Sequence, residues 1–451
     1  MRRDEEREIR VLATGFGPVP GTNAHAAALL TLATAIHGEL DLVCRKDAGL
    51  AHQSRMGRAR LFRVPAAGTP GEAMASFARA VRRQLEAASY DVVHVRGPVE
   101  GAAVAPLVSA MGSRLIYEVG TFADAAAAGA EESAWSRDHE ECLAAADLVL
   151  VGGEAARRAL AARGLEGRVR VLPPGVDVDT FDRCAADPAP SARLLFLGSF
   201  TADRALGTVL AALREVSAVR PLRALFAGDP ALSRREELRR LVSAFGLDEV
   251  VEVAGEPRPA LLPAILAAAD VVVVPAAAAP RYEELGALPE PLLEAMACGR
   301  PLVAARVPAV AEIARDEVEG LLYPPGEEDT LAECVLTLLR EPALAERLGA
   351  AAHARVRAGW GSAFRRGRLV ELYEGLVPGS QRRDPWTHGF GPRATTDLGS
   401  SPSSVLRGLA MEEGTAPEAE LAQLAADTVV GAPAPSLDEE GTAVGVDAPE
   451  P

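Results

Sequence analysis

Short apolar runs rich in β-branched residues alternate with alanine-rich segments over most of the chain, and glycine or proline bounds many of the runs. Such runs are typical of strands buried on both faces, and the longer segments between them have the spacing of helices. Alternating strands and helices predict the α/β class, a parallel sheet covered by helices on both sides. The runs form two series, at residues 9–14, 40–44, 90–95, 113–118 and 146–151, and then at 194–198, 224–228, 250–255, 271–275 and 301–304.

The two series predict two doubly wound, Rossmann-like domains in tandem, because a chain of 451 residues is too long for one ordinary core. We place the first domain at residues 1–185 and the second at 192–358, with the proline-rich segment 187–191 between them. From about residue 329 to 376 the pattern is helical. Open α/β sheets bind ligands at the carboxyl ends of their strands, so we expect the ligand site in the cleft between the domains.

Residues 378–451 are rich in proline, serine, glycine, alanine and acids, and we interpret them as a disordered acidic tail. Residues 391–451 hold 11 acidic residues against 2 arginines, which supplies much of the net charge of -16. A solvating extension is the preferred interpretation of this tail, and a segment that docks a partner protein is the alternative. The acidic balance argues against nucleic acid as a partner, since nucleic acid normally meets a basic surface.

The five cysteines are scattered, which argues against a disulfide framework or a zinc site. No stretch reaches the roughly 20 apolar residues of a membrane helix, and the charged N-terminus lacks the features of a signal peptide. A reducing cytoplasm is the simplest setting for such a chain. Lys46 is the single lysine, so arginine carries nearly all the positive charge.

The chain is organised around residues 290–304, where a short helix follows the buried strand at 271–275. Proline at 291 suits a first helical turn and Gly299 ends the helix, which places Glu294 near the carboxyl edge of a sheet. At such an edge main-chain amides and the helix dipole can meet phosphate. In the first series, strand 9–14 runs into a glycine- and proline-rich loop at 15–22, which we interpret as neither helix nor strand, and a helix is predicted over 24–36.

Seven motifs then occur in the order of a known family. They are Asp-Val-Val-His-Val at 91–95, Ala-Asp-Leu-Val-Leu-Val at 146–151, Val-Leu-Pro-Pro-Gly-Val-Asp-Val-Asp-Thr-Phe at 171–181, Leu-Phe-Leu-Gly at 195–198, Glu-Ala-Met-Ala-Cys-Gly-Arg-Pro-Leu-Val at 294–303, Glu-Val-Glu-Gly-Leu-Leu-Tyr-Pro-Pro-Gly at 317–326, and Trp360 with Tyr373. Residues 9–377 thereby resemble the retaining, nucleotide-sugar-dependent glycosyltransferases of the GT-B fold, family 4. The resemblance implies that the first domain holds the acceptor and the second the donor, and that a helix at 359–377 crosses back to the first.

The resemblance assigns a donor site to the second domain. Glu294 matches the second glutamate of the family's Glu-x7-Glu motif, which accepts hydrogen bonds from the ribose hydroxyls of the donor. We take Arg204 and Glu290 as the catalytic candidates. The expected donor-binding residues are Gly198, Ser199, Arg204, Gly228, Leu292, Leu293 and Glu294.

Two parts of the donor site depart from the family pattern. Gly286 stands where the first glutamate of the motif belongs, and the spacing does not choose among Glu283, Glu284 and Glu290 as its replacement. The family carries an arginine followed by a lysine where this chain has Ser199 and then an arginine at 204. An arginine can stabilise a departing diphosphate, whereas a serine donates a hydrogen bond but no charge.

On the acceptor side, the resemblance places the glycine loop beside the donor diphosphate and the acceptor. Gly21, Thr22 and His25 are the candidates from this region, together with His94 near the end of a strand on the cleft side. A structural histidine is the alternative for both imidazoles. Gly-Thr at 120–121 replaces a polar residue that the family often uses to contact the acceptor.

We therefore expect a cytoplasmic enzyme that moves a hexose-type sugar from a nucleoside diphosphate to a glycan or lipid-linked acceptor, with retention at the anomeric carbon. A lipid-linked acceptor would hold it at the inner face of the membrane as a peripheral protein. No cofactor or metal is expected, because Asp177 and Asp179 fit a loop feature and Cys298 a packed core position. The altered motifs support one alternative, a degenerate homologue that binds a nucleotide or a partner protein without turnover, and a sugar-nucleotide epimerase is a third hypothesis.

Overall fold

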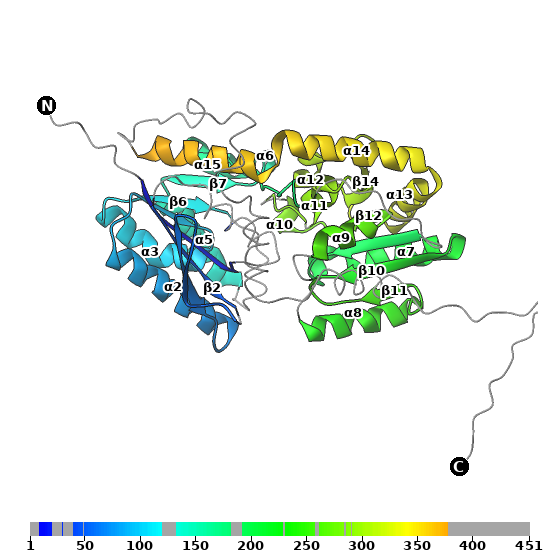
Figure 1. Cartoon of the computed structure of the whole chain (residues 1–451), viewed down its shortest axis with the longest axis horizontal. Coiled ribbons are helices and arrows are strands. Elements are labelled where there is room, and N and C mark those ends of the chain that lie inside the picture. The colour runs from blue at the N-terminus through cyan, green and yellow to red at the C-terminus, as the bar shows by residue number, and fades with distance from the viewer. Residues whose placement is uncertain are drawn as a thin grey trace, which may run out of the picture.

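The computed structural model describes residues 9–19, 29, 39–47, 49–119, 132–181, 192–228, 231–257, 261–283, 286–289 and 291–377. These residues form two α/β lobes that lie side by side (Figure 1). We call the lobe built on β1 to β8 the N-terminal lobe and the lobe built on β9 to β14 the C-terminal lobe. The strands of the N-terminal lobe are β1 Arg10–Pro18, β2 Glu39–Lys46, β3 Gln53–Met56, β4 Ala59–Pro65, β5 Val92–Val95, β6 Arg114–Glu118, β7 Leu148–Val151 and β8 Val169–Val171. Those of the C-terminal lobe are β9 Ala192–Leu197, β10 Leu222–Ala227, β11 Val251–Val253, β12 Val271–Val274, β13 Leu302–Ala305 and β14 Leu321–Tyr323.

Helices connect the strands in both lobes. In the N-terminal lobe they are α2 Pro70–Ala87, α3 Pro98–Ala110, α5 Glu132–Ala145, α6 Glu154–Leu160, and the short turns η1 Ala161–Leu165 and η2 Glu166–Arg168. In the C-terminal lobe they are η3 Ala202–Arg204, α7 Leu206–Val219, α8 Leu232–Ala244, α9 Leu262–Ala268, α10 Pro280–Glu283, α11 Leu292–Ala297, α12 Pro308–Ile313 and α13 Glu328–Arg340. Two long helices follow, α14 Pro342–Gly359 and α15 Ser362–Leu376.

Both sheets have the strand order of doubly wound folds. The order is β3-β4-β2-β1-β5-β6-β7-β8 in the N-terminal lobe and β11-β10-β9-β12-β13-β14 in the C-terminal lobe. Each sheet grows outward in both directions from its first strand, β1 or β9, and ligands bind near such a reversal point. The prediction of two parallel, helix-covered sheets is therefore confirmed.

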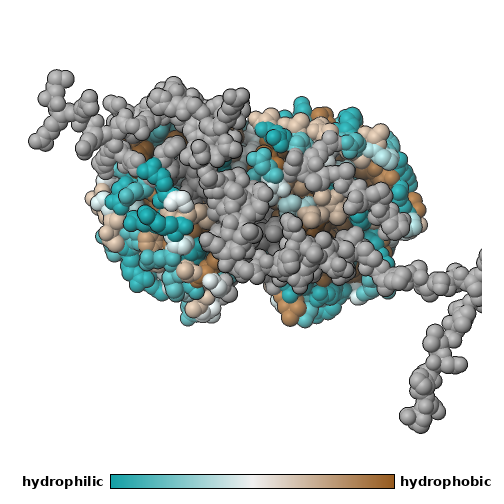
Figure 2. Space-filling view, viewed as in Figure 1, coloured by the Kyte–Doolittle hydropathy of each residue, from teal (hydrophilic) through white to brown (hydrophobic). Residues whose placement is uncertain are grey.

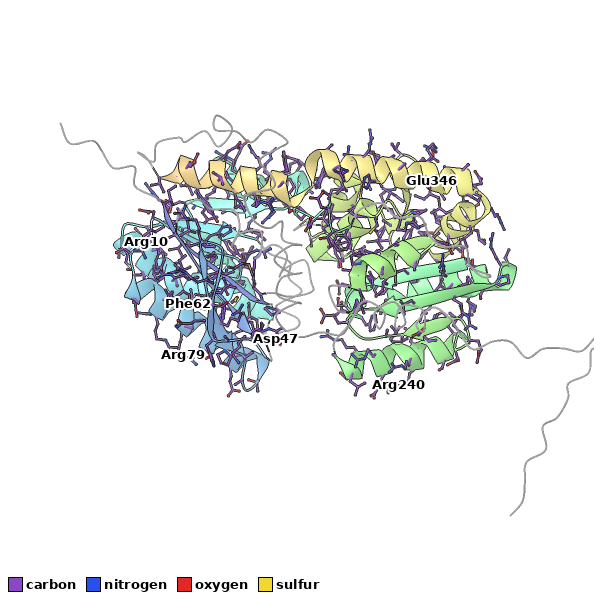
Figure 3. The ribbon with its side chains drawn as sticks, viewed as in Figure 1. Arg10, Asp47, Phe62, Arg79, Arg240 and Glu346 are labelled. Atoms are coloured by element: carbon purple, nitrogen blue, oxygen red, sulfur yellow. The ribbon has the colours of Figure 1, made fainter. Side chains whose placement is uncertain are left out.

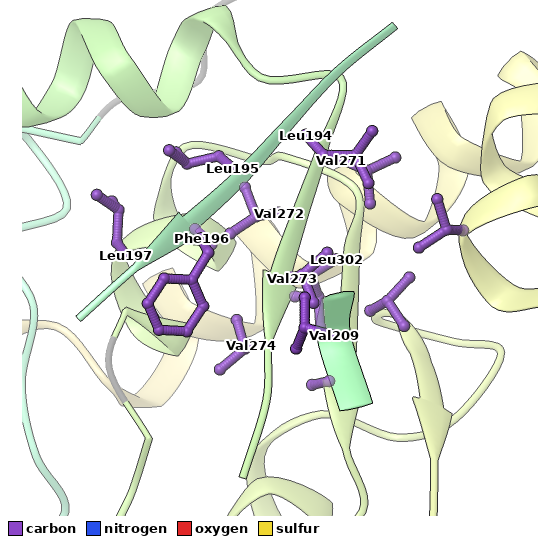
Figure 4. Packing of buried hydrophobic residues seen from close by; sticks show 14 of the residues in the cluster. Leu194, Leu195, Phe196, Leu197, Val209, Val271, Val272, Val273, Val274 and Leu302 are labelled. Carbon is purple, nitrogen blue, oxygen red and sulfur yellow. The ribbon is translucent and has the colours of Figure 1, made fainter. Parts of the chain in front are cut away.

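The position of β12 at the centre of the C-terminal sheet explains why every residue of this strand is apolar. β12 lies between β9 and β13, and all four of its valines are buried. Successive side chains of a strand point to opposite faces, so four buried valines in a row require cover on both faces. Figure 4 shows these valines packed with Phe196 of β9, Val209 of α7 and Leu302 of β13.

The last two helices join the lobes. α14 lies over the C-terminal lobe and α15 over the N-terminal lobe (Figure 1). Leu369 and Tyr373 of α15 are buried in the core that forms beneath the N-terminal sheet. Between the helices, the amide of Val176 donates to the carbonyl of Trp360 at 2.9 Å, and the amide of Ser362 donates to the carbonyl of Val176 at 2.8 Å. The crossing helix thus passes the segment that leaves β8, and the lobes meet at this point.

Two local predictions for the N-terminal lobe were wrong or incomplete. The segment 15–18, predicted to be neither helix nor strand, continues β1 as far as Pro18, with a register shift that pairs Gly15 with Cys44 and Pro18 with Arg45. A bulge lets proline sit in a strand because the missing N–H is not needed there. The antiparallel pair β3 and β4 was not predicted from the sequence, since β3 is mostly polar. The predicted helix at 24–36 lies outside the described residues except for Leu29.

The outer surface is polar, as expected for a helix-covered sheet. Hydrophilic residues are spread over the outer face of the N-terminal lobe (Figure 2), and Arg79 on α2 and Arg240 on α8 are exposed at the outside of their lobes (Figure 3). Within the described residues no helix combines the length and the apolar character that a bilayer crossing requires.

Candidate active site between the two lobes

A cavity of about 380 Å³ opens between the lobes, at the carboxyl edges of the two sheets. Both lobes contribute to its lining, together with Trp360 and Arg365 from the segment that crosses between them. The charged residues among its lining are Arg96, Glu118, Glu154, Glu294, Glu312 and Arg365. A cavity at this edge is where doubly wound sheets bind ligands.

The wall from the C-terminal lobe is the start of α11. Leu292, Leu293 and Glu294, three predicted donor contacts, all line the cavity. Pro291 precedes the helix, and Gly299 ends it in the left-handed region with φ 63°. The predicted position of Glu294 in the first turn is confirmed; its contact with a donor ribose stays a prediction.

The absence of the first glutamate has a structural counterpart. Gly286 lines the cavity, and its φ is 64°. Residues other than glycine rarely adopt this left-handed backbone conformation. A Cβ atom added there would lie 3.0 Å from the Cβ of Ala156 in the opposite lobe. The chain therefore has a close contact between the lobes where the family carries a carboxylate.

The candidate replacements for that carboxylate differ in what the structure says of them. Glu283 is exposed on α10 and is not among the cavity-lining residues. Glu284 and Glu290 lie outside the described residues. The choice between them, and the catalytic role predicted for Glu290, stay predictions.

The predicted phosphate-binding loop follows β9. Gly198 and Gly228 both have positive φ, 126° and 125°, and a Cβ on Gly228 would lie 2.6 Å from the amide nitrogen of Gly198. Two strand ends therefore approach so closely that only glycine fits at either position. The hydroxyl of Ser199 lies 3.1 Å from that of Thr201. None of the three predicted residues Gly198, Ser199 and Gly228 is among the described residues that line the cavity.

Arg204 ends the turn η3 and is 3% exposed. Its Nε donates to the carbonyl of Pro275 at 3.1 Å, and its Nη2 donates to the carbonyl of Leu197 at 3.3 Å. The guanidinium also lies over the ring of Phe196, 5.0 Å from its centroid. The side chain therefore holds the carboxyl ends of β9 and β12 together, and its predicted role towards a leaving diphosphate stays a prediction.

The wall from the N-terminal lobe is built on Glu118, a buried carboxylate at the end of β6 that sequence reasoning missed. Arg96 donates through Nε to Oε1 of Glu118 at 3.1 Å, and its Nη2 lies 3.1 Å from the same oxygen. Arg365 of α15 donates through Nη2 to Oε1 at 2.7 Å and through Nη1 to the carbonyls of Leu172 and Pro173. Burial by itself would raise the pKa of Glu118, but Arg365, Arg96 and His94 hold that pKa well below its usual range.

His94 lies behind this wall and is fully buried. Its Nε2 lies 3.2 Å from Oε2 of Glu118, and its Nδ1 lies 2.6 Å from the hydroxyl of Tyr373 on α15. Burial lowers the pKa of His94, so the ring is neutral. Which ring nitrogen of His94 carries the proton decides whether the hydroxyl of Tyr373 donates to Nδ1 or accepts from it. His94 is not among the described residues that line the cavity. The other predicted acceptor-side residues, Gly21, Thr22 and His25, lie outside the described residues.

Glu312 of α12 connects the lobes across the cavity rim. Its carboxylate accepts from the amide of Glu154 at 2.8 Å and from the amide of Ala155 at 2.6 Å, at the start of α6. Gly153, at the N-cap of that helix, has no side chain to cap it. One lobe therefore caps a helix of the other, and the carboxylate also meets the positive end of the helix dipole.

Asp177 lies in a loop and Cys298 in a packed core, as the sequence predicted for each. The carboxylate of Asp177 accepts from the amide of Asp179 at 3.3 Å and from the hydroxyl of Thr180 at 2.9 Å, as in an Asx-turn. Cys298 is 1% exposed and lies in the core of the C-terminal lobe. Among the residues that the structure describes, no group of three His, Cys, Asp or Glu side chains is arranged to hold a metal ion.

Two family models match the sequence. Residues 20–175 match a glycosyl transferase 4-like domain, and residues 191–341 match the glycosyl transferases group 1 domain. The chain belongs to the group 1 glycosyltransferases. The two matches follow the two lobes in order, with the first on the N-terminal lobe and the second on the C-terminal lobe.

The curated relatives match only part of the chain. An alpha-D-kanosaminyltransferase from Streptomyces kanamyceticus is 32% identical over 34% of this chain and 38% of its own length. A D-inositol 3-phosphate glycosyltransferase from Kineococcus radiotolerans is 31% identical over 53% of this chain and 59% of its own length. The matched part of this glycosyltransferase thus spans about half the length of these curated relatives.

Solved structures share the fold over most of both chains. Sucrose-phosphate synthase from Thermosynechococcus elongatus superposes with a TM-score of 0.69 at 21% identity, covering 82% of this chain and 99% of the other. The HepE protein of Anabaena, solved in complex with UDP-glucose, has a TM-score of 0.64 at 15% identity and covers 81% of this chain and 100% of its own. At these identities the likeness establishes the GT-B fold alone.

Proposed function

We propose that the protein transfers a hexose-type sugar from a nucleoside diphosphate to a glycan or lipid-linked acceptor, with retention at the anomeric carbon and without a metal. The observation that carries the proposal is the position of Glu294, at the wall of an inter-lobe cavity in a group 1 glycosyltransferase. In this proposal the N-terminal lobe holds the acceptor and the C-terminal lobe the donor. The protein works in the cytoplasm and associates with the membrane surface where the acceptor is lipid-linked.

The donor would be held by its ribose and its diphosphate. Glu294 accepts hydrogen bonds from the two ribose hydroxyls, which suits a carboxylate because it has only acceptor sites. Catalysis comes mainly from positioning the reactants and from stabilising the departing diphosphate. Ser199, Gly198, Gly228 and Arg204 at the β9 edge are the groups proposed for that stabilisation.

The test is donor binding and slow donor hydrolysis by the purified chain without added metal, across uridine, guanosine and adenosine diphosphate sugars. Glu294→Ala is expected to weaken binding of the preferred donor by about 10- to 100-fold, the worth of hydrogen bonds to a charged group. Glu346→Ala removes an exposed carboxylate on α14 and is the matched control, with binding expected to stay as in the wild type. Arg204→Lys keeps the positive charge but removes the guanidinium that lies over Phe196. The rate of donor hydrolysis by this variant tests whether Arg204 takes part in hydrolysis.

A second candidate is a degenerate homologue that binds a nucleotide or a partner protein without turnover. Arg204 favours it, because two of its donors serve the main-chain carbonyls of Pro275 and Leu197. Gly286 favours it too, since it occupies the position of a family carboxylate. Tight donor binding without hydrolysis or transfer, with every glycan and lipid acceptor offered, would select this candidate. Failure to bind any donor would refute the donor-site proposal.

A further inference from the structure

The start of α6 and the two glycines before it lie against the opposite lobe. The carboxylate of Glu312 accepts from the first two amides of α6, and a Cβ added to Gly153 would lie 2.5 Å from its Oε2. Gly286 covers the positions on either side. Its carbonyl oxygen lies 3.9 Å from a Cβ added to Gly152, and its own added Cβ would lie 3.0 Å from the Cβ of Ala156. Two residues of the C-terminal lobe therefore hold one helix end of the N-terminal lobe.

The N-cap of α6 leaves the capping of this helix to the other lobe. Gly153 has φ -160° and no side chain that could cap the helix. Any residue adopts such an extended backbone, so a side chain at this position would be opposed only by the nearby carboxylate of Glu312. A serine here would cap α6 within its own lobe, as serine does at many helix starts. The capping across the lobe boundary can therefore be separated from the capping of the helix.

Glu312 is tied to the point where the chain crosses between the lobes. Arg355 of α14 donates to the main-chain carbonyls of Glu312 and Ile313, at the end of α12. The same guanidinium lies 4.9 Å from the ring centroid of Trp360, in the turn between α14 and α15. The residue that caps α6 and the crossing turn are therefore connected through one side chain.

The residues of this contact also form part of the cavity wall. Gly152, Gly153, Glu154, Gly286 and Glu312 all line the cavity. Two domains of one chain are expected to move relative to each other unless a contact holds them. Separation of the lobes breaks the hydrogen bonds of Glu312 and widens the cavity along this edge. The contact therefore acts on how open the cavity is.

We propose that Glu312 and the start of α6 form a latch that holds the two lobes closed over the cavity. The latch combines an N-cap hydrogen bond with a negative charge at the positive end of a helix. An N-cap interaction is worth about 2- to 30-fold in an equilibrium, and loss of the latch shifts the ratio of closed to open lobes by that factor. Such a latch acts whatever ligand the cavity takes, so it stands or falls independently of the proposed function.

The test measures the distance between the lobes in the full chain without added ligand. Spin labels are attached through Arg79→Cys on α2 and Arg240→Cys on α8, two exposed positions on the outside of the lobes (Figure 3). Cys184→Ala and Cys334→Ala are present in every sample, and the other three native cysteines are buried and stay. Double electron–electron resonance then gives the populations of the label distances.

Three variants separate a latch between lobes from a simple helix cap. Glu312→Ala removes the carboxylate. Gly153→Ser gives α6 a cap of its own and places a side chain where the carboxylate lies. The double variant keeps the helix capped without Glu312. The matched control is Gly167→Ser, at an exposed glycine of the same lobe where an added Cβ meets no atom within 4 Å.

We expect the wild type and Gly167→Ser to have the same distribution of label distances, dominated by closed lobes. Glu312→Ala and the double variant should both gain a second distance from open lobes, with the ratio of closed to open lobes lowered by about 2- to 30-fold. Gly153→Ser should shift the distribution in the same direction, because its side chain displaces the carboxylate.

Two results would overturn the latch. If Glu312→Ala has the same distance distribution as the wild type, Glu312 does not hold the lobes together. If Glu312→Ala opens the lobes but the double variant returns to the wild-type distribution, Glu312 serves only as a cap for α6. Neither result bears on the donor site, which donor binding and hydrolysis test separately.

Discussion

The carboxylate of Glu118 is predicted to contribute more to stability than any exposed ion pair of the N-terminal lobe. It is 6% exposed, and its contacts join β6 to Arg96 after β5 and to Arg365 on α15. Glu118→Gln keeps the size of the side chain and one hydrogen-bond acceptor but removes the negative charge that two nearly buried guanidinium groups share. Removing one partner of a buried pair typically costs about 3–5 kcal/mol.

Because glutamine can still accept from Arg365, we expect the lower end of that range, about 3 kcal/mol. For domains of the size of one lobe, each kcal/mol lowers the melting temperature by roughly 2–4 °C, so the expected loss is about 6–12 °C. Differential scanning calorimetry is the suitable assay. Two lobes need not unfold as one unit, so the comparison is made on transition midpoints rather than on a fitted free energy.

The matched control is Glu86→Gln, which breaks an exposed pair with Arg82 one helical turn away on α2. Their side chains are 48% and 53% exposed, and such pairs contribute little, so the midpoint should move by less than about 2 °C. The reasoning is refuted if Glu118→Gln shifts the midpoint no more than Glu86→Gln does. That result would mean that the packing of Leu369 and Tyr373 and the other hydrogen bonds of α15 are enough to hold the crossing helix.

Two further predictions concern packing and pH. Gly349→Ala in α14 should destabilise the chain by about 1–3 kcal/mol despite alanine's higher helix propensity, because the added Cβ would lie 2.2 Å from the carbonyl oxygen of Gly299. The control is Gly367→Ala in α15, where an added Cβ meets no atom within 4 Å. In the same melting experiment this control should be neutral or stabilising. Stability should fall as the pH drops from about 6.5 towards 4, because burial lowers the pKa of His139 to about 4 and only the unfolded chain takes up the proton in that window. The free energy of unfolding should fall by up to about 1.4 kcal/mol per pH unit in that window. Melting midpoints of the wild type and His139→Gln, measured from pH 7.5 to 5, test this. If the midpoint of His139→Gln falls with pH as steeply as that of the wild type, the prediction is wrong. Glu118 acts at lower pH, because its pKa is lower in the folded chain than the ordinary value of 4.5. The stability that its carboxylate contributes is fully present above pH 4.5 and is lost only as the pH falls below that value.

The sequence predicted the parts of the fold that depend on local pattern. Four consecutive valines at 271–274 and the glycine after the short helix have one simple interpretation each, and both were confirmed. The extension of β1 through Pro18 was missed because glycine and proline argue against a strand, whereas pairing with β2 across a bulge overrides that local preference. β3 was missed for a similar reason, since its strand character comes from pairing with β4 rather than from its own residues.

The candidate site was predictable only in the half that a contiguous motif encodes. Glu294 and its two leucine neighbours lie together in the chain, so a spacing argument finds them. Glu118 and Arg365 are 247 positions apart and meet only because α15 crosses back over the N-terminal lobe. An isolated charged residue in a sequence is normally predicted to be exposed. Its neighbours in the sequence do not show that the fold buries it beside a distant partner of opposite charge. The signal that could have identified Glu118 is its place at the end of a strand that is otherwise apolar.

One departure from the family pattern, the missing carboxylate, is explained by its neighbours in space. The position of the missing carboxylate is Gly286, where the backbone is left-handed and an added Cβ would lie 3.0 Å from the Cβ of Ala156, so a glutamate there would be strained and would push against Ala156. Ala156 belongs to α6, the same helix whose first amides are capped by Glu312 of the opposite lobe. The lobes are therefore in direct contact along this edge of the cavity. Among the described residues, the charged groups on the cavity wall include Glu294 of the C-terminal lobe on one side and Glu118 with its two arginine partners on the other.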